Sequence, residues 1–227
     1  MTAPLYVSPE QWYQDKAEYA RKGIARGKPI VALEYAGGIM LMGENRSASL
    51  RKISEIYDRI AFAAVGKFDE YENLRKAGIR YADLRGYSYC RDDVMAKSLA
   101  NEYSTVLGSI FTREMKPFEV ELLVAEVGET QNALYQILYD GSVNDHERYA
   151  SIGGDADKIC GVLRESWSEE MKLDEAVKLS RKSLLAANGG VGELNEQSLE
   201  VAVLERAREG RKFRKLGTDE IRELLSG

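Results

Sequence analysis

Histidine, the side chain most used for acid–base and metal chemistry, occurs once in this sequence. Among 227 residues the single histidine is His146, so a serine–histidine–aspartate triad or a multi-histidine metal site would have to use it. It lies in a polar run with Asn144, Asp145 and Glu147, and no cysteine is near it. This setting predicts a solvated loop histidine rather than a catalytic or metal-binding one.

Short motifs for metals, phosphates and disulfides do not change that expectation. The sequence has no CxxC pair, no HExxH and no P-loop. The glycine-rich run 189–192 follows a helical pattern and has no strand before it, so it indicates the end of a helix and a loop. The two cysteines, Cys90 and Cys160, indicate reduced thiols in a cytoplasmic protein. We therefore expect no metal and no cofactor.

Composition narrows the class of protein further. A chain of 227 residues with 44% hydrophobic residues can bury one sizeable core. A net charge of −5 creates no global field for nucleic acid. No apolar run approaches the roughly 20 residues that span a bilayer, and the N-terminus lacks the pattern of a secretory signal. We expect no nucleic-acid partner, no membrane partner and a cytoplasmic location.

The first elements that could position functional side chains are a helix and a hairpin. Ser8 suits an N-cap, Pro9 the first helical position, and Gln11 would complete a capping box. The pattern predicts a helix over 9–26 whose apolar stripe includes Trp12, Tyr19 and Ile24, with Ala17 and Ala20. Segments 30–35 and 38–43 predict a hairpin with Gly37-Gly38 as its turn.

Later segments alternate groups of strands with pairs of helices. Ile53, Ile56 and Ile60 lead into an apolar strand over 60–65. Helical periodicity predicts helices over 68–84, 92–115, 156–169 and 173–187, and a short final helix capped by Thr218. Further strands are expected over 119–127, 133–139, 148–152, 199–204 and 212–216. This order predicts an α+β fold in which two antiparallel sheets face each other, with a helix pair on each outer face.

Two further groups of residues are interpreted as structural rather than functional. A basic cluster near the C-terminus is interrupted by acids and indicates an edge strand protected by charge; it comprises Arg206, Arg208, Arg211, Lys212, Arg214 and Lys215. Tyr87, Tyr89 and Cys90 connect two predicted helices, and we expect them to be packed.

Three local motifs together resemble one family. They are Ser8-Pro9-Glu10 with Glu18-Tyr19-Ala20-Arg21 and Gly27; Ser49-Leu50-Arg51-Lys52-Ile53 with Asp58-Arg59-Ile60; and Asp140-Gly141-Ser142 with Ile152-Gly153-Gly154. The layout resembles the α-type subunits of the proteasome core particle, in their actinobacterial form. The resemblance implies the N-terminal-nucleophile hydrolase fold, a four-layer α/β/β/α sandwich with an added N-terminal helix. It implies a single domain over 1–227, with a gate segment over 1–8, the helix over 9–26 and the sandwich over 28–227.

The chemistry of that fold can be tested on this sequence. Active members use an N-terminal threonine, supported by an acid and a lysine. By the family pattern these positions fall near Lys28, Gly37 and Asn45, and none has the required residue type. No Ser, Thr or Cys lies between Gly23 and Ser47, so a small slip in alignment changes nothing. The resemblance therefore implies a non-catalytic subunit.

Two alternatives remain open at this point. Removal of Met1 would expose Thr2, which could serve as the nucleophile of an active threonine protease or amidase, although a helix separates it from the predicted sheet. The chain could also be a ring-forming interaction module with no proteolytic partner.

The resemblance implies roles for particular residues. The gate would comprise Leu5, Tyr6, Val7, Ser8, Pro9 and Tyr19, although a merely disordered terminus would also fit the residues ahead of the helix. Docking of a regulatory ring ATPase, through its C-terminal carboxylate, would use Lys52 with Gly27, Gly66 and Lys67. The other implied partners are the proteasome β subunit, neighbouring α subunits in a seven-membered ring, and unfolded, tagged protein substrates in transit.

Overall fold

Two five-stranded antiparallel sheets form the centre of the molecule in the computed structural model, which describes residues 8–47, 49–187 and 194–226. The first sheet has the order β10-β9-β2-β1-β8, with bounds Phe213–Lys215, Leu199–Glu205, Gly38–Glu44, Ile30–Tyr35 and Tyr149–Ile152. The second sheet has the order β3-β4-β5-β6-β7, with bounds Ile53–Tyr57, Ile60–Gly66, Val120–Glu126, Ala133–Ile137 and Val143–His146.

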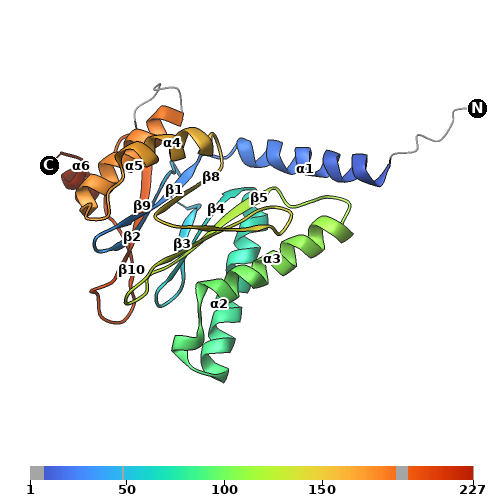
Figure 1. The fold of residues 1–227 in the computed structure, drawn as a ribbon, viewed down its shortest axis with the longest axis horizontal. Coiled ribbons are helices and arrows are strands. Elements are labelled where there is room, and N and C mark those ends of the chain that lie inside the picture. Colours follow the sequence, from blue (N-terminus) through green and yellow to red (C-terminus); the bar gives the residue numbers. More distant parts are fainter. Residues whose placement is uncertain (1–7, 48, 188–193, 227) are drawn as a thin grey trace, which may run out of the picture.

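Helices cover both outer faces of the sheet pair (Figure 1). The first sheet is covered by α4 (Ala156–Ser166) and α5 (Leu173–Ala187), with α6 (Thr218–Ser226) packed beside α5. The second sheet is covered by α2 (Phe68–Ser88) and α3 (Ala96–Arg113). One apolar cluster lies between the sheets and one lies under each helical layer. The predicted four-layer α/β/β/α sandwich is therefore confirmed.

Alternation along β1 shows why these strands are apolar throughout. Ile30 and Ala32 belong to the cluster between the sheets, whereas Val31 and Leu33 belong to the cluster under α4 and α5. Successive side chains of a strand point to opposite faces, so a strand covered on both faces needs apolar residues at consecutive positions. All seven residues of β2 are buried for the same reason.

The N-terminal helix α1 (Pro9–Ala25) begins as its sequence predicts. The Ser8 hydroxyl accepts a hydrogen bond from the Gln11 backbone N–H at 3.2 Å, and Pro9 takes the first helical position. The second half of the expected capping box does not form, because the Gln11 amide donates instead to Asp15, at 2.8 Å. The helix extends outward beyond the sandwich, with its first residues farthest from the sheets (Figure 1).

The buried face of α1 differs from the expected stripe. Ala20 and Ile24 are buried as predicted, but Trp12 and Tyr19 are 39% and 49% exposed. The third buried position is Lys16, whose side chain is buried and whose ammonium donates a hydrogen bond at the C-terminal end of α3. The expected stripe is therefore buried only in its second half, where Ala20 and Ile24 lie.

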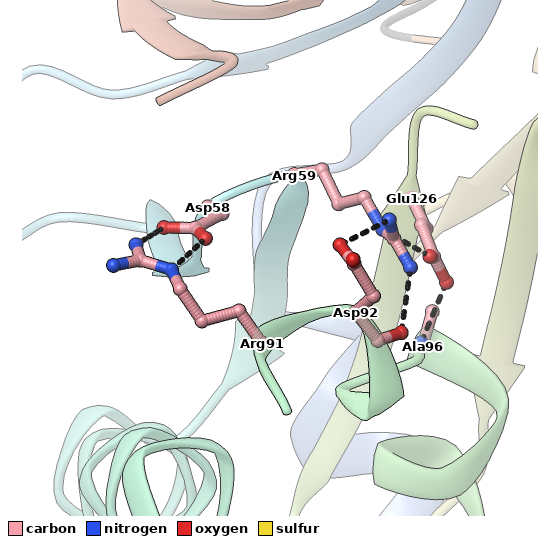
Figure 2. Close-up of polar contacts among 6 residues, drawn as sticks. All are labelled: Asp58, Arg59, Arg91, Asp92, Ala96 and Glu126. Carbon is pink, nitrogen blue, oxygen red and sulfur yellow. Dashed lines mark hydrogen bonds and ion pairs between the residues drawn. The ribbon is translucent and has the colours of Figure 1, made fainter. Parts of the chain in front are cut away.

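The third helix begins later than the predicted range 92–115. Arg91–Asp93 forms a 3-10 turn, Met95 is extended, and α3 starts at Ala96. The cause is visible in Figure 2, where the Glu126 carboxylate accepts the Ala96 N–H at 2.7 Å and also binds Arg59 at 2.7 Å. A carboxylate at the first turn supplies the acceptor that the free N–H groups of a helix need. That acceptor lies 30 residues away in sequence, so local periodicity could not reveal it.

Other boundaries also needed correction. The hairpin turn is Ala36-Gly37, since Tyr35 pairs with Gly38; Gly38 belongs to β2 with a φ of +148°. β3 and β7 are separate strands that the sequence reading missed, because both are short and only partly buried. The predicted helices 9–26, 68–84 and 156–169 end instead at Ala25, Ser88 and Ser166. The basic C-terminal cluster does include an edge strand, β10, as expected.

None of the helices described here is both long enough and apolar enough to cross a membrane. The expected gate residues Leu5, Tyr6 and Val7, the alternative nucleophile Thr2 and the glycine-rich run 189–192 lie outside the described residues.

Candidate functional site

Oppositely charged side chains meet where β1 and β3 begin, and we call Lys28, Glu44, Lys52 and Glu200 the lysine–glutamate cluster. Lys28 precedes β1, Glu44 ends β2, Lys52 precedes β3 and Glu200 lies in β9. The antiparallel hairpin brings the first two together, since Ile30 pairs with Gly43. The cluster thus joins both sheets at one end of the sandwich.

Glu44 is the buried acid of this cluster. Its residue is only 5% exposed. Nζ of Lys28 lies 3.3 Å from one carboxylate oxygen, and Nε of Arg46 lies 3.2 Å from the other. A buried carboxylate needs such partners, because burial of an unpaired charge is costly. Lys28 is thereby held beside the acid.

Of the two lysines of the cluster, Lys52 has no carboxylate directly beside its ammonium in the described part of the chain, whereas Lys28 has Glu44. Lys52 is half-buried, and its ammonium donates a hydrogen bond to the Lys28 backbone carbonyl at 3.2 Å. Within the part of the chain that the structure describes, its ammonium makes no direct ion pair. Burial lowers the pKa of Lys52 below its ordinary value of 10.5, while the charges of Glu200 and Glu44 oppose that shift. Such an ammonium is suited to bind an incoming carboxylate.

Two predicted docking glycines pack close to this lysine. A Cβ at Gly27 would lie 2.3 Å from a Val65 methyl group, and one at Gly66 would lie 1.8 Å from the Glu119 carbonyl oxygen. Gly66 also has a φ of +116°, in the region that favours glycine. The two glycines therefore let α1, β4 and β5 approach one another beside Lys28.

The fourth predicted docking residue, Lys67, has a different environment. Its ammonium lies 3.7 Å from the Glu70 carboxylate, which also binds Lys116 at 2.8 Å and the Glu119 N–H at 2.6 Å. The Lys67 charge is thus directed toward the start of α2.

The three positions expected for a missing catalytic set do not come together. Lys28 and Asn45 lie in the same region, but Gly37 is in the hairpin turn beyond the far end of β1, and β1 alone spans about 17 Å at the usual rise of a strand. The residues that adjoin Lys28 are instead an acid, Glu44, and a lysine, Lys52. Residue 28 itself presents an ammonium, where a nucleophile of this kind would need a hydroxyl or thiol. Asn45 has a structural role, donating to Leu50 O and Glu200, both at 2.7 Å.

A groove of about 760 Å³ lies at the opposite end, near the hairpin turn. Its wall includes His146, which is half-buried in β7 rather than in the solvated loop that we expected. Nε2 of His146 lies 2.8 Å from Oε1 of Gln136, and burial lowers the pKa of His146. Trp167 donates to Glu34 O across the same groove, at 2.9 Å. His146 and Trp167 thus each have their own hydrogen-bond partner, and the described residues of the groove show no catalytic arrangement.

Metal-binding residues do not gather anywhere in the described ranges. Among residues 8–47, 49–187 and 194–226, no three His, Cys, Asp or Glu side chains are placed to share a cation.

Besides Leu50 and Met115, large apolar side chains of the described residues are exposed in two groups. On α1 these are Trp12, Tyr13 and Tyr19, at 39%, 40% and 49% exposure. At the connection between α2 and α3 they are Leu84, Tyr87, Tyr89 and Met95, with Tyr87 91% exposed. The expected packing of Tyr87, Tyr89 and Cys90 within the chain was therefore wrong. Exposed apolar groups gathered in this way are typical of surfaces that meet another protein.

Two residues of the cluster were not found by sequence reasoning. Glu44 had one local signal, an acid closing an apolar strand. Glu200 had none, because its partners Lys52 and Asn45 are 148 and 155 residues away in sequence.

The chain is similar to known proteins along its whole length. Residues 24–204 match the family described as "Proteasome subunit". A protein named "Proteasome subunit alpha" from Kineococcus radiotolerans is 54% identical over 235 residues, covering 100% of this chain and 99% of the relative. Proteins of the same name from an Arthrobacter species and from Thermobifida fusca are 52% and 49% identical, covering 100% and 99% of this chain and 99% and 91% of those relatives.

Proposed function

Since the chain belongs to the proteasome subunit family and resembles its α-type members over its full length, we propose that it is a non-catalytic α subunit. In this role it forms an outer ring with copies of itself, scaffolds the β subunits, and admits unfolded, tagged substrates. It also docks a ring ATPase. Its free thiols, Cys90 and Cys160, suit the reducing cytoplasm.

The non-catalytic assignment rests on residue 28, which is a lysine where a catalytic subunit would have its nucleophile. An acid, Glu44, and a lysine, Lys52, adjoin residue 28, yet that residue is itself a lysine inside the chain. Without a hydroxyl or thiol on a free N-terminal residue, no covalent acyl intermediate forms there. The alternative use of Thr2 gains no support, because the 17 residues of helix α1 separate it in sequence from the first strand.

Exposed aromatics on α1 support the ring. Trp12, Tyr13 and Tyr19 project from a helix that extends beyond its own sandwich (Figure 1). A neighbouring copy would cover these side chains and recover their hydrophobic burial. Ser8 and Pro9 would then fix where the proposed gate segment leaves this helix.

Docking is assigned to Lys52. A C-terminal carboxylate offers the anion that its ammonium lacks, and Gly27 and Gly66 allow the close packing of backbone segments beside it. Lys67 would contribute less, because Glu70 already faces its ammonium.

The test is a set of lysine variants in particles co-assembled with the β subunit and mixed with the ring ATPase of the same organism. Lys52→Ala should abolish ATPase-stimulated protein degradation and leave peptide cleavage by the core unchanged. Lys67→Ala should reduce stimulation less, and the control Lys178→Ala, on the outer helix α5, should leave it unchanged. Full stimulation in Lys52→Ala particles would overturn the docking assignment.

A further inference from the structure

One acid reaches across the sandwich to the segment that carries Lys52. Glu200 belongs to β9 of the first sheet, and its side chain is 11% exposed. Its carboxylate points into the connection between β2 and β3, where the chain passes from the first sheet to the second.

Both oxygens of this carboxylate are used. Oε2 accepts hydrogen bonds from the Lys52 backbone N–H at 3.0 Å and from the Asn45 amide at 2.7 Å. Oε1 accepts from the Ile53 N–H at 3.4 Å and from the Lys215 ammonium at 2.5 Å. Four donors from three separate segments thus converge on one side chain.

These bonds matter because the backbone before Lys52 is not part of a strand. Residues 45–47 and 49–52 have no strand ladder to hold them. The Asn45 amide also binds Leu50 O, and Lys52 O accepts from the Ala64 N–H at 3.1 Å. Hydrogen bonds to a charged acceptor are stronger and shorter than neutral ones. Glu200 therefore holds the backbone that carries the Lys52 side chain in place.

The charge of Glu200 also acts on the Lys52 ammonium. It raises the pKa of Lys52 against the larger effect of burial, as does Glu44, whereas Lys28 lowers it. Lys215 forms an ion pair with Glu200. The charge of Glu200 also acts on Tyr71 of α2, whose pKa is raised to about 12 by burial and by that charge. Glu200, Glu44 and Lys28 therefore act on the Lys52 ammonium directly, whereas Lys215 and Tyr71 act on Glu200.

We propose that Glu200 is a positioning residue for docking, which holds the Lys52 backbone in place so that its ammonium is presented to an incoming carboxylate. This inference rests on the proposed docking function of Lys52. It adds a residue that touches no partner and acts only through Lys52.

The experiment compares Glu200→Gln and Glu200→Ala with Lys52→Ala in the assembled particle, using the ring ATPase of the same organism as the probe. The matched control is Glu205→Gln, since Glu205 ends the same strand and pairs with Arg214 instead. Binding of the ATPase should weaken about tenfold or more in Glu200→Ala. Glu205→Gln should bind as the unmodified particle does, and peptide cleavage by the core should stay unchanged in all of them.

The pH profile separates this role from a merely structural one. Glu200→Gln keeps the size of the side chain and one oxygen acceptor but loses the charge. Binding of the ATPase should therefore be lost at a lower pH in Glu200→Gln than in the unmodified particle, whereas simple loosening would weaken binding equally at every pH.

The outcomes distinguish the two proposals. If Lys52→Ala loses docking while both Glu200 variants dock normally, the role of Glu200 is wrong and the docking function stands. If Lys52→Ala docks normally, the docking function itself is wrong. Failure of Glu200→Gln to assemble, when Glu205→Gln does assemble, would also overturn a role confined to docking.

Discussion

At the scale of single residues, burial lowers the pKa of Lys52 and the nearby acids Glu200 and Glu44 raise it. Its ammonium has a backbone carbonyl as hydrogen-bond partner, while Glu44 is occupied by Lys28 and Arg46. Burial is the larger influence, so the pKa of Lys52 is lowered. Lys52 therefore gives up its proton at a lower pH than a surface lysine does.

This balance predicts a pH dependence of docking. The protonated ammonium binds a carboxylate and the neutral amine does not, so ATPase binding should weaken as pH rises through the lowered pKa of Lys52. The loss should begin below the ordinary value of 10.5. Titration of ATPase binding to the assembled particle between neutral and alkaline pH would measure it.

Lys52→Arg provides the matched control, because a guanidinium stays charged throughout this range. Whatever affinity that variant retains should not fall with pH. A wild-type profile as flat as that of the arginine variant would contradict the assigned role of the ammonium. For folding alone the sign is opposite: the unfolded chain binds this proton more tightly, so the contribution of Lys52 to stability rises between its lowered pKa and 10.5.

At the scale of elements, α1 is attached through a lysine whose residue is only 4% exposed. The Lys16 ammonium donates to the backbone carbonyls of Phe111, at 2.9 Å, and Glu114, and lies 3.9 Å from the centre of the Trp12 ring. These carbonyls belong to the C-terminal end of α3, where a helix presents unpaired acceptors and negative partial charge. The orientation of the outer half of α1 depends on this contact.

Replacing Lys16 with Met should therefore release the outer half of α1. The apolar chain keeps its packing, but two carbonyls lose their charged donor, which we expect to cost about 1–3 kcal/mol. Hydrogen exchange in the first turns of α1 should become faster. Lys22→Met is the control, since Lys22 makes only an exposed pair with Glu18; equal effects of the two variants would contradict the anchoring role.

A second contact sets the start of α3. Arg59 binds the Glu126 carboxylate at 2.7 Å and the Asp92 carbonyl at 3.1 Å, while Arg91 binds Asp58 in an exposed pair (Figure 2). Together they fasten the turn between β3 and β4 to the connection that carries the exposed Tyr87 and Tyr89.

Arg59→Met should loosen this connection more than Arg91→Met does. Loss of Arg59 leaves the half-buried Glu126 charge with only the Ala96 N–H, whereas Arg91 is largely exposed and its pair with Asp58 is screened by water. Exchange of the first amide protons of α3 should accelerate in Arg59→Met and stay near normal in Arg91→Met. The reverse order would show that the exposed pair holds the connection.

At the scale of the whole molecule, the order of strands and helices was enough to predict the sandwich. Ile30 to Leu33 show why: apolar residues on both faces of a strand require cover on both sides. What could not be predicted depends on distant partners. The start of α3 needs Glu126, the Lys52 backbone needs Glu200, and the exposure of Trp12 and Tyr87 fits an assembly rather than one chain. Local periodicity carries none of this information.

The central claim is that this chain builds and gates a protease without performing its chemistry, and one measurement tests it most directly. The co-assembled particle is treated with a threonine-directed covalent inhibitor, and the intact mass of each chain is recorded. The account predicts an adduct on the β subunit and an unmodified mass for this chain. An adduct at Thr2 of this chain, with peptide hydrolysis by the chain in the absence of any β subunit, would contradict it.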